Sequence, residues 1–505
     1  MSIAQSFSTV AMDHRVRYKN TGLDAKELRR RREENSVQLR KQKRDDVLLK
    51  RRTLAPANNH LDSSNDNDDS DTSITLNSTE TDIISQEVID GLMQDDNQQL
   101  LVECARRVRK ISSKEPQPPF DDLIATGLVP RFVALLDRHD NPTIQFEVEW
   151  VLTNICSGTT EQTAVVVDNG ALPKLVNLMS SPDISVCEQA VWALGNVIGD
   201  NEKYRDVVIG YGFVSALLNL IRPNLEIGFL RNATWVIVNL CRNKQPPIKI
   251  EVVAQLIPAL LYLIESPDHN ILIDTTWAVS YITELGPNYS QLIIDSGIVN
   301  RMAPLLTHQE TKIQIAAIRA LGCITTGNDV QTQVVIDAGA VPHLCVNLRC
   351  MRDKATLVKE TLWFLSNIAA GSVEQIQSLI DAGTMPEVVY YLKNGEFLQQ
   401  REAVWTVFNY CLNGSVKQLS YLIDIDVIPA LCDLLVIKDV NVVRNVLEAI
   451  SCLMGSCADR TESIREIIEQ CGGVDKIEAL QDSTNSDIGV FSSGILEKYF
   501  QEEEP

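Results

Sequence analysis

The six tryptophans of this chain and the residues four positions after them suggest a binding chemistry. Five of the six form pairs with an asparagine: Trp150/Asn154, Trp192/Asn196, Trp235/Asn239, Trp363/Asn367 and Trp405/Asn409. Because residues four apart on a helix share one face, each pair presents an indole beside a carboxamide. The carboxamide suits hydrogen bonding to the main chain of an extended peptide. Neighbouring indoles form slots for the aliphatic stem of lysine or arginine, with a cation–π contribution.

A purely structural role is the alternative interpretation of these pairs. Tryptophan is a common core residue, and asparagine can hydrogen-bond from one helix to the next. Because the two residue types recur together at a fixed phase, we favour a peptide-binding ladder over core packing alone.

The spacing of the pairs indicates the elements that must position them. Successive tryptophans are separated by 42, 43, 42, 86 and 42 residues, and 86 is two periods of 43. A period of about 42 residues is typical of armadillo or HEAT solenoids, whose repeats contain two or three helices. The sequence therefore predicts an all-α, right-handed armadillo-repeat superhelical solenoid of about ten repeats, with atypical repeats at its ends.

A second marker keeps the same phase as the tryptophans. A glycine followed by a proline recurs in segments 126–130, 169–173, 338–342 and 382–386, each before an apolar helical pattern. Equivalent positions are Gly212, Gln255, Gly297, Asp426 and Gly473. We expect these positions to end one helix, and the following proline to begin the next.

The charges are distributed unevenly along the 505 residues. The net charge is −21, but residues 15–52 hold 15 Lys/Arg and 6 Asp/Glu, a net of +9. Residues 53–505 hold 31 Lys/Arg and 60 Asp/Glu, a net of −29. An acidic body should repel nucleic acid and attract basic peptides, including its own basic arm.

Several classes of function lack their sequence signatures. There is no GxxxxGK[ST], HExxH or GxSxG motif, and the six histidines show no ligand spacing. The 12 cysteines form no CxxC pair, the N-terminus is unlike a signal peptide, and no apolar run approaches a membrane span. We therefore expect a non-enzyme of the cytosol or nucleus, with no cofactor, metal or membrane insertion.

Composition divides the chain into five parts. Residues 1–14 are predicted to be a disordered tail, 15–52 a basic arm, and 53–81 a flexible acidic and polar linker. The repeats occupy 82–493, and 494–505 form a helix end with an acidic tail. The arm has too few apolar residues to fold alone, so we expect it to become helical when an acidic partner surrounds it. A nucleic-acid-binding or localisation-signal arm is the simpler alternative.

The basic clusters of the arm carry a specific resemblance. Together with Val37-Gln38-Leu39 they resemble the importin-β-binding domain of importin-α; the basic residues are Arg29, Arg30, Arg31, Arg32, Arg40, Lys41, Lys43, Arg44, Lys50, Arg51 and Arg52. With the Trp/Asn ladder, nearly the whole chain resembles this family of nuclear import adaptors. The resemblance implies that the protein binds basic localisation signals of cargo, links them to importin-β, and uses its arm for autoinhibition when importin-β is absent. It also implies shuttling between cytoplasm and nucleus, and as partners a nuclear export receptor with Ran-GTP at the C-terminal segment, and nuclear pore components.

The ladder is interrupted in its middle, where Tyr281 follows Trp277 and where Arg319 and Cys323 replace the next pair. The resemblance assigns the two intact parts to a major and a minor signal site, both occupied by a bipartite signal. The major site comprises Trp150, Asn154, Gly158, Thr163, Gln189, Trp192, Asn196, Asp200, Trp235 and Asn239. The minor site comprises Arg319, Glu360, Trp363, Asn367, Glu402, Trp405 and Asn409, and the linking region Asp274, Trp277 and Tyr281.

Three carboxylates stand close to the ladder in sequence. Asp200 follows Asn196 by four residues, and Glu360 and Glu402 each precede a tryptophan by three, one helical turn away. The resemblance implies that Asp200 pairs with the key lysine of a signal, and we expect its side chain to be exposed in the folded protein. An ordinary solvated acidic face is the alternative. Cys323 removes one amide from the minor side and should weaken it by about 0.5–1.5 kcal/mol.

Two other functions are alternatives to the import adaptor. An armadillo scaffold that binds other extended peptides is the main alternative, and a nucleic-acid-associated factor is the second. The acidic body and the carboxylates beside the tryptophans disfavour a scaffold whose groove binds acidic partners. The acidic body also disfavours nucleic-acid binding, because it repels phosphates.

Overall fold

The computed structural model describes residues 50–51, 84–114, 117–242 and 245–500. The regular elements in these ranges are helices, which confirms the all-α solenoid. None of the described helices is both long and apolar enough to cross a membrane. The predictions for the tail 1–14, the arm before Lys50, Arg52, the linker 53–81 and the acidic end 501–505 lie outside the described residues.

Most repeats consist of two short helices and one long helix, as in α9 (Thr160–Asp168), α10 (Ala171–Leu178) and α11 (Ile184–Asp200). In the repeat that ends in α16 (His269–Thr283), one continuous helix takes the place of the two short ones. The long helices carry the tryptophan positions. Ten such helices lie in the described ranges: α5 (Gln98–Ser112), α8 (Pro142–Cys156), α11, α14 (Ile227–Cys241), α16 (His269–Thr283), α19 (Thr311–Ile324), α22 (Ala355–Ala369), α25 (Phe397–Asn413), α28 (Val440–Ser456) and α31 (Ser486–Tyr499). This number agrees with the predicted ten repeats.

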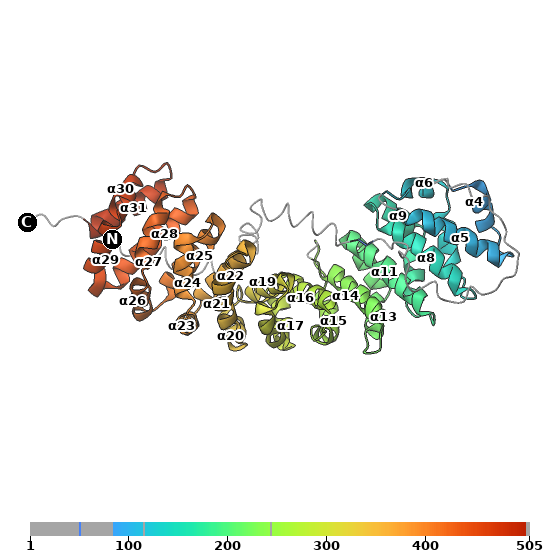
Figure 1. Ribbon diagram of the computed structural model, residues 1–505, viewed down its shortest axis with the longest axis horizontal. Coiled ribbons are helices and arrows are strands. Elements are labelled where there is room, and N and C mark those ends of the chain that lie inside the picture. Colours follow the sequence, from blue (N-terminus) through green and yellow to red (C-terminus); the bar gives the residue numbers. More distant parts are fainter. Residues whose placement is uncertain (1–49, 52–83, 115–116, 243–244, 501–505) are drawn as a thin grey trace, which may run out of the picture. The chain divides into compact units, whose positions relative to one another are not determined.

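The chain forms two compact units, whose described parts run to Leu263 and from Ile264. In the N-terminal unit the long helices α5, α8, α11 and α14 pack side by side in chain order (Figure 1). The other helices of this unit are α4 (Gln86–Leu92), α6 (Phe120–Ala125), α7 (Val129–Leu135), α9, α10, α12 (Glu202–Gly210), α13 (Phe213–Leu220) and α15 (Ile250–Leu263).

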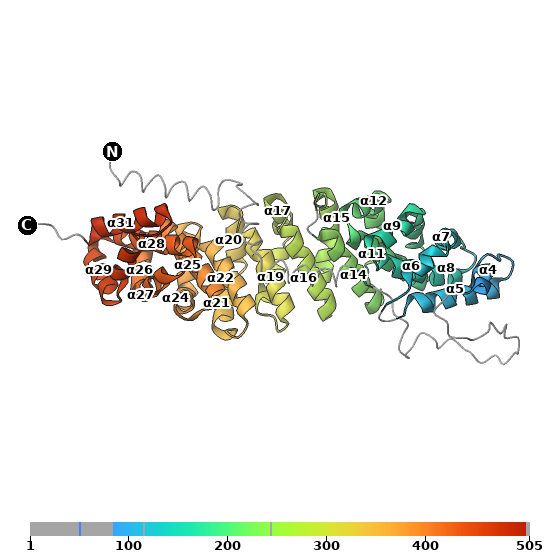
Figure 2. The ribbon, with the colours of Figure 1, turned by 90° about the horizontal axis from the view of Figure 1, so that it is seen from above.

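The C-terminal unit repeats the same packing. Its long helices α16, α19, α22, α25, α28 and α31 each contact the next one along the chain (Figure 2). The shorter elements are α17 (Pro287–Asp295), α18 (Ile298–Met302), η2 (Ala303–Thr307), α20 (Asp329–Asp337), α21 (Ala340–Cys350), α23 (Val373–Asp381), α24 (Met385–Asn394), α26 (Val416–Asp424), α27 (Val427–Asp433), η3 (Leu434–Val436), η4 (Ala458–Arg460), α29 (Thr461–Gln470) and α30 (Gly473–Ala479).

The core lies on the side of each long helix opposite the ladder. A residue two positions after a tryptophan is rotated by about 200° from it, because the helix turns about 100° per residue. These positions, and the equivalent ones after Arg319 and Glu448, are apolar and fully or almost fully buried: Leu152, Leu194, Ile237, Val279, Leu321, Leu365, Val407 and Ile450. Core packing therefore fixes the rotation of each long helix and directs the tryptophan and asparagine to the other face.

The predicted helix-ending glycines adopt left-handed backbone conformations, which glycine adopts without strain. Their φ values lie between 66° and 86° at Gly127, Gly170, Gly212, Gly297, Gly339, Gly383 and Gly472. Two marker assignments were wrong. Gly472, and not Gly473, has the positive φ, since a pair of adjacent glycines leaves the phase ambiguous by one. Gln255 lies inside the continuous helix α15, because no residue there favours a left-handed break.

Glutamines form a second ladder along the first helices of the C-terminal repeats. Gln331, Gln375 and Gln418 each complete a capping box at the start of their own helix. Their Nε2 atoms also donate to the carbonyl oxygens of Pro287, Asp329 and Val373, at 3.2, 2.8 and 2.9 Å, one repeat earlier. This glutamine ladder was not predicted from the sequence, although the 44- and 43-residue spacing of the three glutamines indicates it.

Candidate functional site

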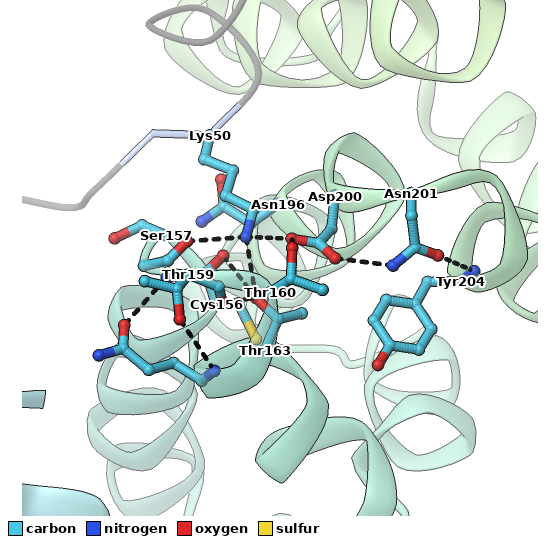
Figure 3. Close-up of polar contacts among 12 residues, drawn as sticks. Lys50, Cys156, Ser157, Thr159, Thr160, Thr163, Asn196, Asp200, Asn201 and Tyr204 are labelled. Carbon is cyan, nitrogen blue, oxygen red and sulfur yellow. Dashed lines mark hydrogen bonds and ion pairs between the residues drawn. The ribbon is translucent and has the colours of Figure 1, made fainter. Parts of the chain in front are cut away.

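The Lys50 side chain ends in a pocket between the C-terminal ends of α8 and α11 (Figure 3). Its Nζ donates to the carbonyl oxygen of Gly158 at 2.8 Å and to Thr163 Oγ1 at 2.9 Å. It also forms an ion pair with Asp200. Since an ammonium group has three N–H donors, these three partners satisfy it completely.

The pocket has a negative potential from two sources. Asp200 is the last residue of α11, and Gly158 lies two residues after the end of α8. The terminal carbonyls of a helix lack intrahelical partners and carry partial negative charge, so a cation is favoured there. Thr163 donates its own hydroxyl hydrogen to Thr159 O at 3.0 Å, which leaves its oxygen free to accept from Lys50.

Asp200 is buried beneath Lys50, and the expectation that its side chain would be exposed was wrong. With Lys50 in place the Asp200 side chain is 2% exposed. Two further donors hold its carboxylate: Thr160 Oγ1 lies 3.2 Å from Oδ1, and Asn201 Nδ2 lies 2.7 Å from Oδ2. The basic arm was expected to be attracted to the acidic body, but burial of Asp200 by Lys50 of that arm was not predicted.

Gly158 is required by its local packing. A Cβ at this position would lie 1.9 Å from Gln162 Oε1. Gln162 cannot move away cheaply, because it forms a capping box with Thr159 and also donates to Asp121 Oδ1 at 2.7 Å. A side chain at residue 158 would therefore disturb the carbonyl that accepts from Lys50.

The main chain of Arg51 contacts one Trp/Asn pair. Asn196 Oδ1 accepts from Arg51 N at 2.7 Å, and Asn196 Nδ2 donates to Arg51 O at 2.9 Å. Trp192 Nε1 donates to the same carbonyl at 2.8 Å. The Arg51 guanidinium carbon lies 4.7 Å from the centroid of the Trp235 ring. One dipeptide thus contacts a carboxamide, an indole N–H and an indole face of the ladder.

The ladder asparagines also bond between repeats, which is the structural role considered as the alternative. Asn196 Nδ2 donates to Thr153 O at 3.0 Å, and Asn154, Asn239, Asn367 and Asn409 donate to Ser112 O, Gly195 O, Gly322 O and Ser366 O at 2.9–3.3 Å. The two roles are compatible, because a carboxamide has two N–H donors and an acceptor. The bond between repeats fixes the amide of Asn196 so that its other atoms face Arg51.

A glycine beside the ladder makes room for the tryptophan of the next repeat. A Cβ at Gly195 would lie 2.5 Å from the Trp235 ring, and one at Gly322 would lie 2.4 Å from the Trp363 ring. Trp235 packs against Gly195 and lies under the Arg51 guanidinium, and it is 1% exposed.

The first ladder position already carries a cation of the chain. The Arg109 guanidinium carbon lies 4.3 Å from the Trp150 ring centroid, and Arg109 Nε lies 2.6 Å from Glu147 Oε2. Gln189 is buried at the next position and donates to Thr153 Oγ1 at 2.7 Å, so it connects two repeats.

The C-terminal unit pairs its ladder carboxylates with neighbouring cations. Arg319 Nη2 lies 3.7 Å from Glu360 Oε1, and Lys359 Nζ lies 2.9 Å from the same atom. The Arg319 guanidinium carbon is 5.6 Å from the Trp277 centroid, and the Trp277 and Tyr281 centroids are 5.8 Å apart.

The remaining minor-site residues follow the same pattern. Glu402 Oε1 lies 3.4 Å from Arg401 Nη2. Trp363, Trp405 and Asp274 are half-buried on α22, α25 and α16, and Cys323 is buried on α19 at an asparagine position of the ladder.

Burial shifts the pKa of Cys156 and of Glu149, which lie close to the ladder. Burial raises the pKa of the Cys156 thiol, beneath the Lys50 pocket, to about 12, so this floor of the pocket is uncharged at neutral pH. Burial, and secondarily the charge of Asp183, raises the pKa of Glu149 well above its ordinary value. Neither Glu149 oxygen has a hydrogen-bond partner among the described residues. Glu149 directly precedes Trp150 and was not predicted from the sequence as a residue of the site.

The described residues contain no group of histidine, cysteine, aspartate and glutamate side chains that could hold a metal ion. All 12 cysteines fall within the described ranges, and all are free thiols.

Comparisons with protein families match three kinds of segment. Residues 14–105 match the family model described as the importin beta binding domain. Residues 116–157, 159–198, 201–242, 245–284 and 328–370 match the armadillo/beta-catenin-like repeat, and 462–505 match an atypical Arm repeat.

Comparisons with individual proteins cover almost the whole chain. Importin subunit alpha-1a of Oryza sativa subsp. japonica is 39% identical over 502 residues, which span 97% of this chain and 92% of the relative. Importin subunit alpha-4 of Arabidopsis thaliana is 40% identical over 494 residues, which span 96% and 91%. The crystal structure of an engineered protein aligns with a TM-score of 0.74 at 25% identity, over 83% of this chain and 99% of that one. The chain therefore belongs to the importin-α family of nuclear import adaptors, which are transport proteins and not enzymes.

Proposed function

We propose that the ladder of the N-terminal unit is the major site for basic nuclear localisation signals, and that Lys50 and Arg51 occupy it as an internal signal. The observation that supports this most directly is the set of contacts made by the dipeptide. The Lys50 ammonium group lies in the Asp200 pocket. The Arg51 main chain hydrogen-bonds to the Trp192/Asn196 pair, and the Arg51 guanidinium lies over the Trp235 ring.

The pocket is selective for lysine over arginine. Its acceptors converge from three directions on one point, which matches the three N–H bonds of a compact ammonium group. A planar guanidinium presents its donors in a fork and is matched by a flat carboxylate instead. The following residue is bound by its main chain and by an indole face, so either basic side chain is accepted there.

The C-terminal unit provides the minor site, which binds the second cluster of a bipartite signal. Its Trp/Asn pairs repeat the arrangement of the major site, but Glu360 and Glu402 already face Arg319, Lys359 and Arg401. A signal must compete with these cations, and Cys323 offers no amide. The minor site is therefore the weaker of the two.

Importin-β binds the basic arm and removes it from the groove. The arm is tethered by a linker, and a flexible tether of this kind gives an effective concentration on the order of 1 mM. A segment of even modest affinity then occupies the groove in most of the free protein. Because removal of the arm frees the groove, cargo and importin-β strengthen each other's binding by the same factor.

The remaining steps of the transport cycle follow from family membership. The C-terminal segment 494–505 engages the export receptor with Ran-GTP, nuclear pore components are transient partners, and the protein shuttles between cytoplasm and nucleus. Release of importin-β in the nucleus lets the arm return to the groove and displace cargo.

The test is a titration of a fluorescent single-cluster signal peptide against the full-length protein, with and without saturating importin-β. The same titration is made with the full-length variant in which Lys50, Arg51 and Arg52 are alanine. We expect weak binding by the unmodified protein alone, and tight binding by the variant or in the presence of importin-β. Equal affinity in all three cases would exclude autoinhibition, and no binding in any case would exclude the site.

A further inference from the structure

Asp200 occupies an unfavourable position for a carboxylate. It is the last residue of α11, where the helix dipole disfavours negative charge and favours a cation. Its oxygens must therefore be held by donors if the pocket is to keep both its charge and its orientation before a lysine arrives. Thr160 supplies one such donor, at 3.2 Å from Oδ1, on the same oxygen that pairs with Lys50.

Asn201 supplies the donor to the other oxygen. Its Nδ2 lies 2.7 Å from Asp200 Oδ2, and its Oδ1 accepts from the backbone N–H of Tyr204 at 2.9 Å (Figure 3). Asn201 is at once the C-cap of α11 and the N-cap of α12, so a single extended residue joins the two helices. The cap fixes the orientation of the Asn201 amide. In the reverse orientation its NH₂ group would face the Tyr204 N–H, and its oxygen would face the Asp200 carboxylate.

We propose that Asn201 is a positioning residue for the signal site, which orients Asp200 so that Oδ1 faces the incoming lysine. With Oδ2 bound to the fixed amide, the carboxylate cannot rotate away from the pocket without losing a charge-assisted hydrogen bond. The same residue that starts α12 thereby sets the affinity for lysine at the end of α11. This inference rests on the proposed function, since it assumes that a cargo lysine takes the place of Lys50.

The chain contains a matched control for the capping role alone. Asn141 caps α8 in the same manner, with Oδ1 accepting from Ile144 N at 3.2 Å, but its Nδ2 faces the neutral Gln98 Oε1 at 2.7 Å. Serine is as good an N-cap as asparagine, yet its shorter side chain cannot also reach a neighbouring carboxylate. Both Asn201→Ser and Asn141→Ser therefore keep an N-cap and remove the side-chain amide. Only Asn201→Ser removes a hydrogen bond to the Asp200 carboxylate.

The experiment measures peptide affinity in the full-length chain with Lys50, Arg51 and Arg52 replaced by alanine. Two peptides are compared, one with lysine at the pocket position and one with alanine there. We expect Asn201→Ser to weaken the lysine peptide about three- to tenfold, the value of a modest hydrogen bond, and to leave the alanine peptide unchanged. Asn141→Ser should change neither, and both variants should unfold at similar temperatures.

The double variant Asn201→Ser with Asp200→Ala distinguishes a failure of the positioning role from a failure of the proposed function. If Asn201 acts through Asp200, Asn201→Ser has no further effect once Asp200 is alanine. Equal losses with and without Asp200, or for both peptides, would overturn the positioning role. An Asp200→Ala variant that binds as tightly as its parent would instead overturn the proposed site. If Asp200→Ala weakens binding while Asn201→Ser does not, only the positioning role is rejected.

Discussion

The N-terminal and C-terminal units present the same Trp/Asn pairs but treat their carboxylates differently. In the N-terminal unit Glu147, three residues before Trp150, is paired with Arg106 and Arg109. Asp200 of the same unit is instead held by uncharged donors and pairs with Lys50, which lies outside the repeats. In the C-terminal unit Glu360 and Glu402 face cations on their own or the adjacent long helix. The ladder supplies a common frame for an extended chain, and the partners of its carboxylates determine how strongly each part attracts a basic signal.

Of the variants that compare the two units, reversal of the Asp200 charge should have the largest effect on peptide affinity. Asp200→Lys places an ammonium group where the signal lysine must be desolvated, so we expect affinity for a single-cluster peptide to fall by about 100-fold or more. Glu360→Lys, the matched change in the C-terminal unit, should leave that peptide unaffected. Fluorescence titration measures both.

Thermal unfolding provides the control for this charge reversal. A lysine at the end of α11 suits the helix dipole, so the fold should be retained. Retained affinity would show that the pocket is misassigned, and loss of folding would show that Asp200 is structural.

Removal of the internal signal should give the next largest effect. Replacement of Lys50, Arg51 and Arg52 by alanine should raise single-cluster peptide affinity by about tenfold or more without importin-β, because a tethered competitor near 1 mM is lost. The gain on adding importin-β should then largely disappear. Isothermal titration with and without importin-β measures both quantities, and an unchanged affinity would indicate that the arm is only a receptor handle.

Paired ladder substitutions compare the two units directly. Trp192→Ala with Asn196→Ala should weaken every basic peptide, whereas Trp363→Ala with Asn367→Ala should weaken bipartite peptides by about tenfold and single-cluster peptides by less than about threefold. Both asparagines also bond to the preceding repeat, so any loss of stability should be similar in the two variants. Equal effects of both double variants on both peptides would contradict a division into major and minor sites.

Glycine substitutions beside Trp235 and Trp363 compare the two units by displacing one indole ring in each, without changing a polar side chain. Gly195→Ala would press on Trp235 and Gly322→Ala on Trp363, and each should destabilise the fold by about 1–3 kcal/mol through overpacking. The first should weaken single-cluster binding because Trp235 carries Arg51, and the second should not. Similar losses of that affinity in both variants would show that the effect of Gly195→Ala is not local.

The sequence predicted those parts of the site that follow from period and helical phase. The Trp/Asn pairs and most helix-ending glycines recur every 42 to 44 residues, so one repeat constrains the next. Contacts that depend on which side chains meet across repeats were missed. Arg109 precedes Trp150 by 41 residues, so a search for cations one repeat from each indole would have found it. Arg319 was named as a site residue, but its contact with Trp277, 42 residues earlier, was not predicted. No periodicity indicates Asn201, because its role comes from a junction of a single residue between two helices.

The buried acid Glu149 allows the smallest test, on stability. In the C-terminal unit the residues directly before Trp363 and Trp405 are the apolar Leu362 and Val404, whereas Glu149 precedes Trp150. Burial raises the pKa of Glu149 well above its ordinary value of 4.5, so the folded protein retains a proton that the unfolded chain loses. Stability from this group is therefore fully present below about pH 4.5 and is lost as the pH rises toward the folded-state pKa, by about 1.4 kcal/mol per pH unit.

Glu149→Gln removes the titration but keeps the shape of the side chain. The difference in thermal midpoint between the variant and the unmodified protein should therefore grow in favour of the variant as the pH increases from 4.5 toward neutrality. Glu402→Gln, at a partly exposed and paired carboxylate of the C-terminal unit, should show no such trend. A constant difference for Glu149→Gln across this range would mean that Glu149 is ionised in the folded protein.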